Sequence, residues 1–267
     1  MNADSDADSD DDADAAFPSP GVDPDIVGDL VARERRTSGL ALRADEPGRT
    51  YSYYDFITTS YKAGNVLRYL GVREGDEVLV VPEALPESVL TFFGAAQLGA
   101  VTRFADDIGE TVPRAVVAPA EREDDFDLPP GHRLAVYGDK PTDPSTTHWE
   151  TEVWSENPAV HPATVTPGDP LLAAAGRTYS HAEALAAASD TVADADLQPG
   201  TEVFVQGSLG DPGVVAAGLL APIMAGATIV FPDPSETPKR ATAESEGDGA
   251  SVVTGTGQPG GSALSSE

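Results

Sequence analysis

The residues best suited to chemistry form one short run rich in glycine and threonine. This run is VTGTGQPGG, Val253–Gly261. Backbone amides of such small residues can close around phosphate oxygens, and a lysine would add positive charge. The run holds no lysine, and the sequence after it is too short for a following helix and strand. We therefore expect no working phosphate site there.

Two further positions could touch a ligand. Arg177 could contact a phosphate, and His181 follows Ser180 at the start of an expected helix. Each also has a simpler interpretation. Arg177 is expected to be an exposed residue at a strand end, as Arg49 would be in an earlier copy of the same pattern, and His181 is expected to face solvent.

Metal and hydrolase chemistry find little support. The spacing of the four histidines does not match that of metal ligands. They are His132, His148, His161 and His181. Asp106-Asp107 and Glu123–Asp125 could bind a hard cation, but solvated loop charge is the expectation. The chain has no cysteine and no G-x-x-x-x-G-K-[ST], G-x-S-x-G or H-E-x-x-H pattern. The sequence thus predicts no catalytic residue and no metal site, and it assigns no cofactor-binding residue.

The charge balance limits the partners. The 267 residues carry 45 acidic and 16 basic side chains, a net charge of −29. Such a surface repels nucleic acid and anionic lipid, so neither is an expected partner. Few lysines and many aspartates are typical of salt-in halophilic archaea, where multimolar salt screens self-repulsion. The alternative is an ordinary acidic protein with a disordered tail. No signal peptide or apolar run of membrane-spanning length is present, so a cytoplasmic protein is expected.

The elements that must position these residues follow a repeated pattern. GRTYS occurs at Gly48 and again at Gly176. In each copy a strand runs into a serine that can cap a helix, Ser52 or Ser180, with an acidic residue three positions on. The expected helices are 53–70 and 181–195.

Each copy then continues with a turn, a strand, a helix and a strand. In the first copy these are Val78–Val81, Pro86–Leu98 and Ala100–Phe104; in the second they are Val203–Val205, Gly213–Ala225 and Ala227–Phe231. Alternating strands and helices predict parallel sheets with right-handed crossovers. The fold class is therefore α/β, with two pseudo-repeated β-α-β-α-β units.

Outside the two copies we expect a first helix over Pro24–Arg36. We also expect strands at Leu40–Arg43, Arg49–Tyr51, Ala115–Ala118, Leu134–Tyr137 and near Val252-Val253. Residues 1–20 are expected to be a disordered acidic tail. Residues 21–236 form the domain, with units at about 39–120 and 169–234, and 237–267 form a mostly disordered tail rich in Ser, Gly and Glu.

The order RTYSYYDF, LGVREGDEVLVV and VLTFFGAAQLGAV, over about Gly39–Asp106, resembles the start of the adenylate-forming superfamily of acyl-CoA synthetases, luciferases and peptide-synthetase adenylation domains. SHAEAL, LQPGTEVFV and VVAAGLLAPIMAGATIVFPDP, over Asp169–Pro234, resemble its next segment. The resemblance implies the large N-terminal domain of an acyl-CoA synthetase, in truncated form.

The same resemblance draws attention to what is missing. Family members place a loop of the form T-S-G-T-T-G-x-P-K-G before a Ser-His pair, to hold the ATP phosphates. Here the chain reads LLAAAGRTYSHAEAL, so Ser180-His181 is present and the loop has shrunk to Ala-Ala-Gly-Arg. The family's Pro-x-x-His-like segment is replaced by GSLGDPG at Gly207–Gly213. Residues for Mg²⁺ and ribose, and the C-terminal domain with its catalytic lysine, would follow residue 234.

Three functions stay open at this point. The first is a degenerate AMP-dependent synthetase-like protein without adenylating activity, a pseudoenzyme or accessory protein that pairs with an intact acyl-CoA synthetase or with itself. The second is an active acyl-CoA or acyl-AMP ligase that works with a partner chain, and only this one calls for ATP or AMP and Mg²⁺. The third is a binding module for a small ligand at the strand ends, near Ser208 or Asp211.

Overall fold

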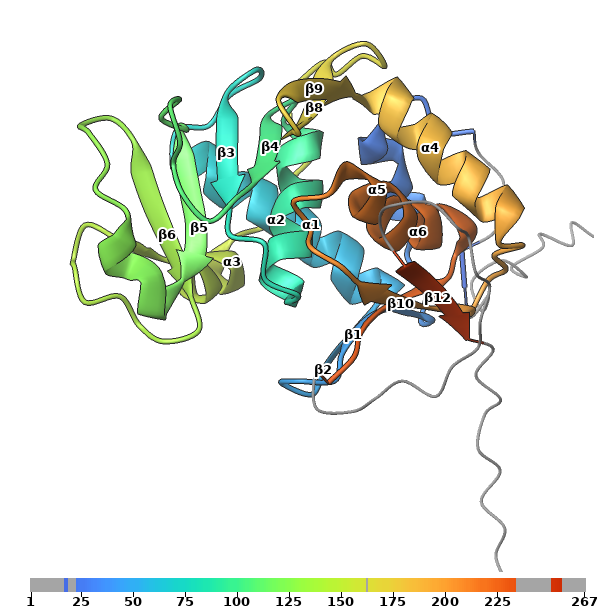
Figure 1. Ribbon diagram of the computed structural model, residues 1–267. Coiled ribbons are helices and arrows are strands. Elements are labelled where there is room, and N and C mark those ends of the chain that lie inside the picture. The colour runs from blue at the N-terminus through green and yellow to red at the C-terminus, as the bar shows by residue number, and fades with distance from the viewer. Residues whose placement is uncertain (1–16, 19–22, 162, 234–250, 256–267) are drawn as a thin grey trace, which may run out of the picture.

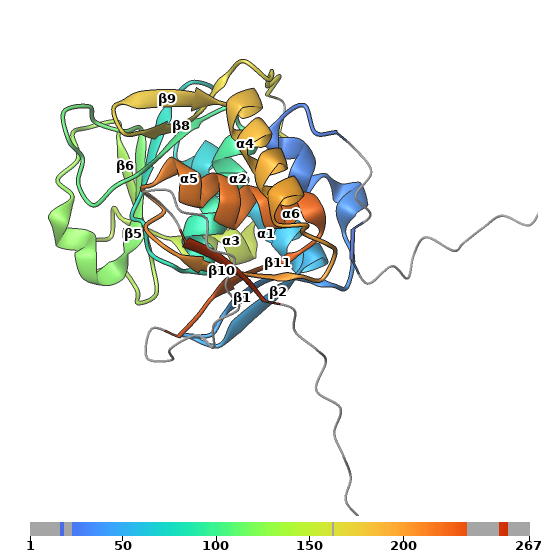
Figure 2. The ribbon, with the colours of Figure 1, turned by 45° about the vertical axis from the view of Figure 1, so that its right-hand side comes forward.

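The computed structural model describes residues 17–18, 23–161, 163–233 and 251–255. The VTGTGQPGG run lies outside these residues beyond Gly255. Two β-sheets enclose a layer of helices (Figures 1 and 2). The seven-stranded sheet has the order β7-β6-β5-β3-β4-β8-β9, and the five-stranded sheet has the order β12-β10-β11-β1-β2. The predicted α/β class with mostly parallel sheets is confirmed.

The first copy of the pattern builds an antiparallel hairpin and then a parallel unit. Its elements are β1 (Leu40–Ala44), β2 (Arg49–Ser52), α1 (Tyr53–Tyr69), β3 (Glu77–Val80), α2 (Pro86–Gln97) and β4 (Val101–Phe104). Ser52 caps α1 by accepting a hydrogen bond from the amide of Asp55. The predicted cap and helix are confirmed, since capping depends only on residues close in sequence.

Three strands and two short helices join the copies. They are β5 (Ala115–Pro119), the 3₁₀ helix η3 (Ala120–Asp125), β6 (Arg133–Tyr137), β7 (Thr147–His148) and α3 (Trp149–Ser155). Strands β5 and β6 lie parallel beside β3, on the side away from β4. After β4 the chain therefore crosses back over β3, and the following strands are added on the other side of β3.

The second copy repeats the plan. Its elements are β8 (Pro170–Ala174), β9 (Arg177–Ser180), α4 (His181–Asp194), β10 (Glu202–Gln206), α5 (Pro212–Val214), the π-helical segment η4 (Val215–Leu220), α6 (Ala221–Ala225) and β11 (Thr228–Phe231). Ser180 and Glu183 form the predicted capping box. Strand β12 (Ser251–Gly255) pairs antiparallel with β10, as the strand predicted near Val252-Val253.

The predicted helix over Gly213–Ala225 contains a π segment because Pro222 has no amide hydrogen for the helical ladder. The predicted helix over Pro24–Arg36 is wrong. The chain forms two 3₁₀ helices there, η1 (Val27–Val31) and η2 (Arg33–Arg35). Val27, Leu30 and Val31 are buried, so the apolar spacing reflects packing rather than a long helix.

The two copies exchange their hairpins. Strand β1 of the first copy pairs with β11 of the second, while β8 of the second copy pairs with β4 of the first. Each sheet thus joins the hairpin of one copy to the parallel strands of the other. The two units at about 39–120 and 169–234 therefore share both sheets and one main core.

Helices α1 and α2 pack against each other at glycines. A Cβ on Gly94 would lie 2.5 Å from the amide nitrogen of Gly64, and one on Gly64 would lie 2.9 Å from the carbonyl oxygen of Gly94. Only a missing side chain permits this approach. The close contact fixes the helix layer on which both sheets rest.

Candidate functional site

The β8–β9 hairpin occupies the position where the resemblance implies a phosphate loop. Ala174 pairs with Arg177, so Ala175 and Gly176 alone form the turn. Their φ angles are +51° and +76°, which suit the tight two-residue turn that connects antiparallel strands. Such a turn has no run of amides that could surround a triphosphate.

Arg177 is held on the outside of this hairpin. Its guanidinium lies 4.0 Å from the ring centre of Tyr179 and donates to Oε1 of Glu183 at 2.6 Å. The side chains of Arg177 and Glu183 are 54% and 51% exposed. The prediction of an exposed strand-end residue is confirmed for Arg177.

The expectation for His181 is wrong. Its side chain is fully buried, and Nδ1 accepts a hydrogen bond of 3.1 Å from the amide of Val27. Burial lowers the pKa of His181 to about 4, although Asp169 and Asp29 act in the opposite direction. The imidazole is therefore neutral at pH 7 and anchors the start of α4 to the N-terminal segment.

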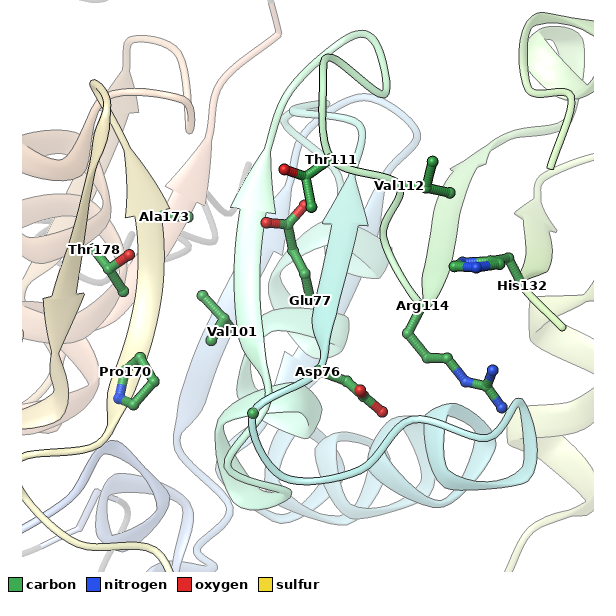
Figure 3. Close-up of a pocket in the computed structure, with 11 residues that line it drawn as sticks. Asp76, Glu77, Val101, Thr111, Val112, Arg114, His132, Pro170, Ala173 and Thr178 are labelled. Carbon is green, nitrogen blue, oxygen red and sulfur yellow. The ribbon is translucent and has the colours of Figure 1, made fainter. Parts of the chain in front are cut away.

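A cavity of about 610 Å³ opens beside the hairpin, on the face of the seven-stranded sheet seen in Figure 3. Its floor includes Val101 of β4, Ala173 of β8 and Thr178 of β9. Asp76 and Glu77 lie at the start of β3, and the strand connections contribute Thr111, Val112, Arg114 and His132 to the wall, with Gly75 and Pro170 completing the lining. The cavity thus lies toward the amino ends of β3 and β4, whereas open α/β sheets usually bind ligands beyond the carboxyl ends.

The charged groups of this cavity are used within the protein. Glu77 accepts a hydrogen bond of 2.8 Å from Nε of Arg103. Arg114 donates to the carbonyl oxygens of Gly71 and Gly131. Asp76 accepts from the amide of Arg73 at 2.7 Å. A triphosphate would meet two carboxylates, and the one arginine of the lining already donates to two carbonyl oxygens, so the lining does not fit ATP.

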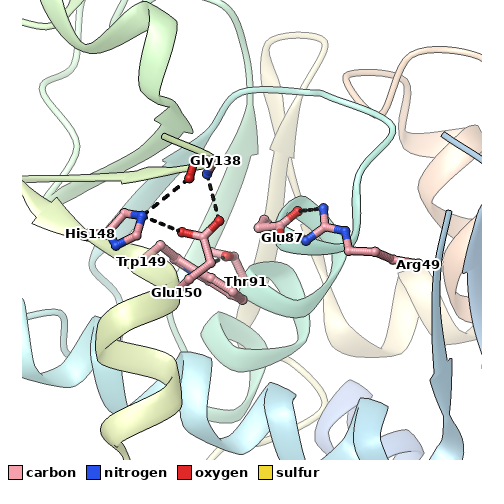
Figure 4. Close-up of polar contacts among 7 residues, drawn as sticks. All are labelled: Arg49, Glu87, Thr91, Gly138, His148, Trp149 and Glu150. Atoms are coloured by element: carbon pink, nitrogen blue, oxygen red, sulfur yellow. Dashed lines mark hydrogen bonds and ion pairs between the residues drawn. The ribbon is translucent and has the colours of Figure 1, made fainter. Parts of the chain in front are cut away.

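An ion pair that the sequence does not reveal lies beyond the carboxyl end of β3, at the start of α2. Arg49 of β2 reaches Glu87 in the first turn of α2, with Nη2 and Oε2 2.8 Å apart (Figure 4). The Glu87 side chain is 1% exposed and that of Arg49 is 35% exposed. The prediction that Arg49 matches Arg177 as an exposed strand end is therefore wrong. No local signal pairs these residues, which are 38 positions apart.

A second polar group lies beside this pair in Figure 4. Glu150 of α3 accepts a hydrogen bond of 2.7 Å from the amide of Gly138, and His148 Nε2 lies 3.2 Å from its other oxygen. The indole of Trp149 donates to the Thr91 hydroxyl at 3.1 Å. These contacts attach α3 to the carboxyl end of β6 and to α2, so their role is structural.

The acidic pairs in the loops differ from one another. Asp106 forms an ion pair of 2.8 Å with Arg122. Glu123 is nearly buried and accepts hydrogen bonds from the amides of Thr142 and Asp143. The amide of Thr142 contributes most to lowering the pKa of Glu123 to about 2. The expectation of solvated loop charge is therefore wrong for Glu123.

The remaining candidates have local structural roles. His132 contacts the carbonyl oxygen of Pro113 at 2.6 Å, and buried His161 stacks on Tyr61. Ser208 and Asp211 accept hydrogen bonds from amides in their own turn. Within the described ranges, no cluster of three or more His, Asp or Glu residues could hold a metal ion.

The comparisons with known proteins agree on the fold. No family model matches the chain. Acetyl-coenzyme A synthetase of Gemmatimonas aurantiaca is 35% identical over 69 residues, or 25% of this chain and 11% of its own length. 4-Coumarate–CoA ligase 3 of Oryza sativa subsp. japonica is 38% identical over 61 residues, or 23% of this chain and 11% of its own length.

Solved structures match over a longer stretch. The anthranilate CoA ligase AuaEII, in complex with anthranoyl-AMP, has a TM-score of 0.68 at 19% identity and covers 79% of this chain and 45% of that one. The N-terminal domain of FACL13 from Mycobacterium tuberculosis has a TM-score of 0.63 at 16% identity, covering 77% of this chain and 56% of that domain.

The chain therefore has the fold of the N-terminal part of the adenylate-forming acyl-CoA synthetases. It spans about a tenth of the length of the curated relatives and about half of these solved chains. No helix among the described residues is long and apolar enough to cross a membrane.

Proposed function

We propose that this protein is an adenylate-forming-ligase-like protein that does not form adenylates and acts as an accessory protein. The fold supports a common framework with the acyl-CoA synthetases. The observation that carries the proposal is the two-residue turn Ala175-Gly176 at the place where family members hold the ATP phosphates.

The chemical reason is electrostatic. Adenylate formation needs donors and positive charge around the phosphates as charge develops, and removal of one such group commonly costs several kcal/mol of barrier lowering. Arg177 is engaged by Glu183, and the adjoining cavity presents Asp76 and Glu77. Of the lysines, Lys62 lies in α1 and Lys140 lies between β6 and β7, and Lys239 is outside the described residues.

ATP–pyrophosphate exchange tests this proposal. The protein would be assayed in multimolar KCl with Mg²⁺ and a panel of carboxylic acids, with an intact acyl-CoA synthetase as the positive control. No exchange above the rate without enzyme is expected. Acid-dependent exchange by the purified chain would overturn the proposal.

A second candidate is an active acyl-CoA or acyl-AMP ligase that works with a partner chain. Its support is the fold, which this chain shares with the anthranilate CoA ligase AuaEII in complex with anthranoyl-AMP. Exchange that requires both this chain and a co-purified protein would favour this candidate. The binding-module hypothesis receives less support, because Ser208 and Asp211 already bind amides in their own turn.

The acidic composition supports a cytoplasmic protein of a high-salt cell. With a net charge of −29, self-repulsion should destabilise the fold at low ionic strength and be screened in concentrated salt. The melting temperature should therefore rise steeply with KCl. A melting temperature independent of KCl would contradict the halophilic origin.

A further inference from the structure

One face of the seven-stranded sheet lacks a helical layer. The opposite face carries α1, α2 and α3, which pack into the main core. On this second face the crossover from β4 to β5 is residues 105–114, without a helix, and that from β5 to β6 is residues 120–132, with only the short η3. We call this surface the loop-covered face. Parallel sheets normally carry helices on both faces.

The loop-covered face has a small core and two hollows. Ile108 and Leu128 pack, with Phe126, on an apolar cluster of the strands: Leu79, Val81, Val116, Ala118, Leu134 and Val136. The 610 Å³ cavity lies on one side of His132, and a second cavity of about 420 Å³ lies on the other. The apolar Val112 is 40% exposed at the first cavity.

The loops that shape these hollows are tied in place by charged side chains. Arg103 donates to the carbonyl oxygens of Asp107 and Ile108 at 3.1 and 2.7 Å. Arg122 links Asp106 to Asp125, and Glu123 binds two amides of the loop after β6. A surface that is already ordered needs little further ordering when a partner binds.

The charge of the loops defines the partner. Residues 105–114 and 120–132 contain eight acidic and two basic side chains. Several of the acids are exposed around the hollows, including Glu110, Asp124 and Asp127. A second copy of a chain with a net charge of −29 would bring like charge to this face, which is unfavourable wherever salt does not screen it. A basic helix with an apolar stripe matches both the exposed acids and the partly exposed apolar side chains of this face, Val112, Ile108 and Leu128.

We propose that the loop-covered face is the docking site for a basic amphipathic helix of a partner protein. The helix takes the place of the missing layer, lays its apolar stripe over Val112 and the cavity, and directs its lysines or arginines toward the acidic rim. This proposal rests on the proposed accessory role, for which it supplies the surface and the chemistry of the partner.

The test uses the full chain and a synthetic amphipathic Leu/Lys helix of about 18 residues, which spans roughly 27 Å. Binding is measured by fluorescence anisotropy over a series of KCl concentrations, because concentrated salt screens the charge pairs, against a scrambled peptide of equal composition. Val112→Lys should weaken binding at least tenfold. The matched control is Val160→Lys, a residue 65% exposed in the segment after α3, which should leave the affinity unchanged.

Equal affinities of the two variants, or equal binding of the scrambled peptide, would overturn the docking site. So would a dimer of the chain that Val112→Lys dissociates, since the occupant would then be a second copy. Amide exchange should slow in residues 105–114 when the peptide binds. No peptide binding together with no pyrophosphate exchange would refute the docking site and leave the proposed function standing. Acid-dependent exchange together with peptide binding would refute the proposed function, and the docking site would then no longer serve an accessory role.

Discussion

Arg49 and Arg177 occupy matching positions in the two GRTYS hairpins but have opposite surroundings. Arg49 neutralises Glu87, whose side chain is 1% exposed, whereas Arg177 pairs with a half-exposed Glu183. Arg49→Met keeps an apolar stem of similar length and removes the cation. Glu87 is then a buried carboxylate without a counter-ion.

The expected loss follows from the burial of Glu87. Breaking a buried pair by removing one partner costs about 3–5 kcal/mol. Because Arg49 is 35% exposed, we expect Arg49→Met to lower the free energy of unfolding at pH 7 by an amount at the lower end of this range, about 3 kcal/mol.

Urea denaturation in constant KCl measures this loss, and Arg177→Met is the control. Arg177→Met, like Arg177→Ala, should leave the unfolding midpoint unchanged because its pair is exposed and screened by salt. In the double variant with Glu87→Gln, much of the loss should be recovered. Equal small effects of the two arginine substitutions would refute the reasoning.

Three further predictions concern stability. Burial lowers the pKa of His181 and of His161 to about 4, so stability should fall by up to about 3 kcal/mol per histidine between about pH 6.5 and pH 4, and His181→Gln should flatten that slope in acid titrations. Glu123 has a lowered pKa, so Glu123→Gln should reduce the melting temperature at pH 7, with a difference that narrows below about pH 4. Gly94→Ala places a Cβ 2.5 Å from the Gly64 amide nitrogen and should cost about 1–3 kcal/mol in urea unfolding. The first prediction is contradicted if His181→Gln leaves the pH dependence of stability unchanged. The second is contradicted if the difference in melting temperature between Glu123→Gln and the parent is the same at every pH, and the third if Gly94→Ala leaves the free energy of unfolding unchanged.

Local patterns predicted most of the elements. Ser52 and Ser180 identify the starts of α1 and α4 because a capping bond joins residues three apart. Gly226, with a φ of +74°, likewise ends α6 within one turn. Such signals involve only neighbouring residues, so they do not depend on the packing of distant segments.

The errors come from contacts between distant segments. His181 is buried because Val27, 154 positions earlier, packs over the start of α4. Arg49 differs from Arg177 because it reaches Glu87 of α2, 38 positions away, whereas Arg177 pairs with Glu183, six positions away. Neither the pairing of β1 with β11 nor the cavity beside β9 has a signal in local spacing, since both depend on how the two sheets are assembled.

The most direct test of the absence of a phosphate site is a calorimetric titration of ATP into the protein in multimolar KCl with Mg²⁺. The two-residue turn of the β8–β9 hairpin and the carboxylates of the cavity toward the amino ends of the strands predict no saturable heat. Saturable ATP binding that is abolished by Thr178→Glu, in the cavity wall beside Ala173, would contradict this account.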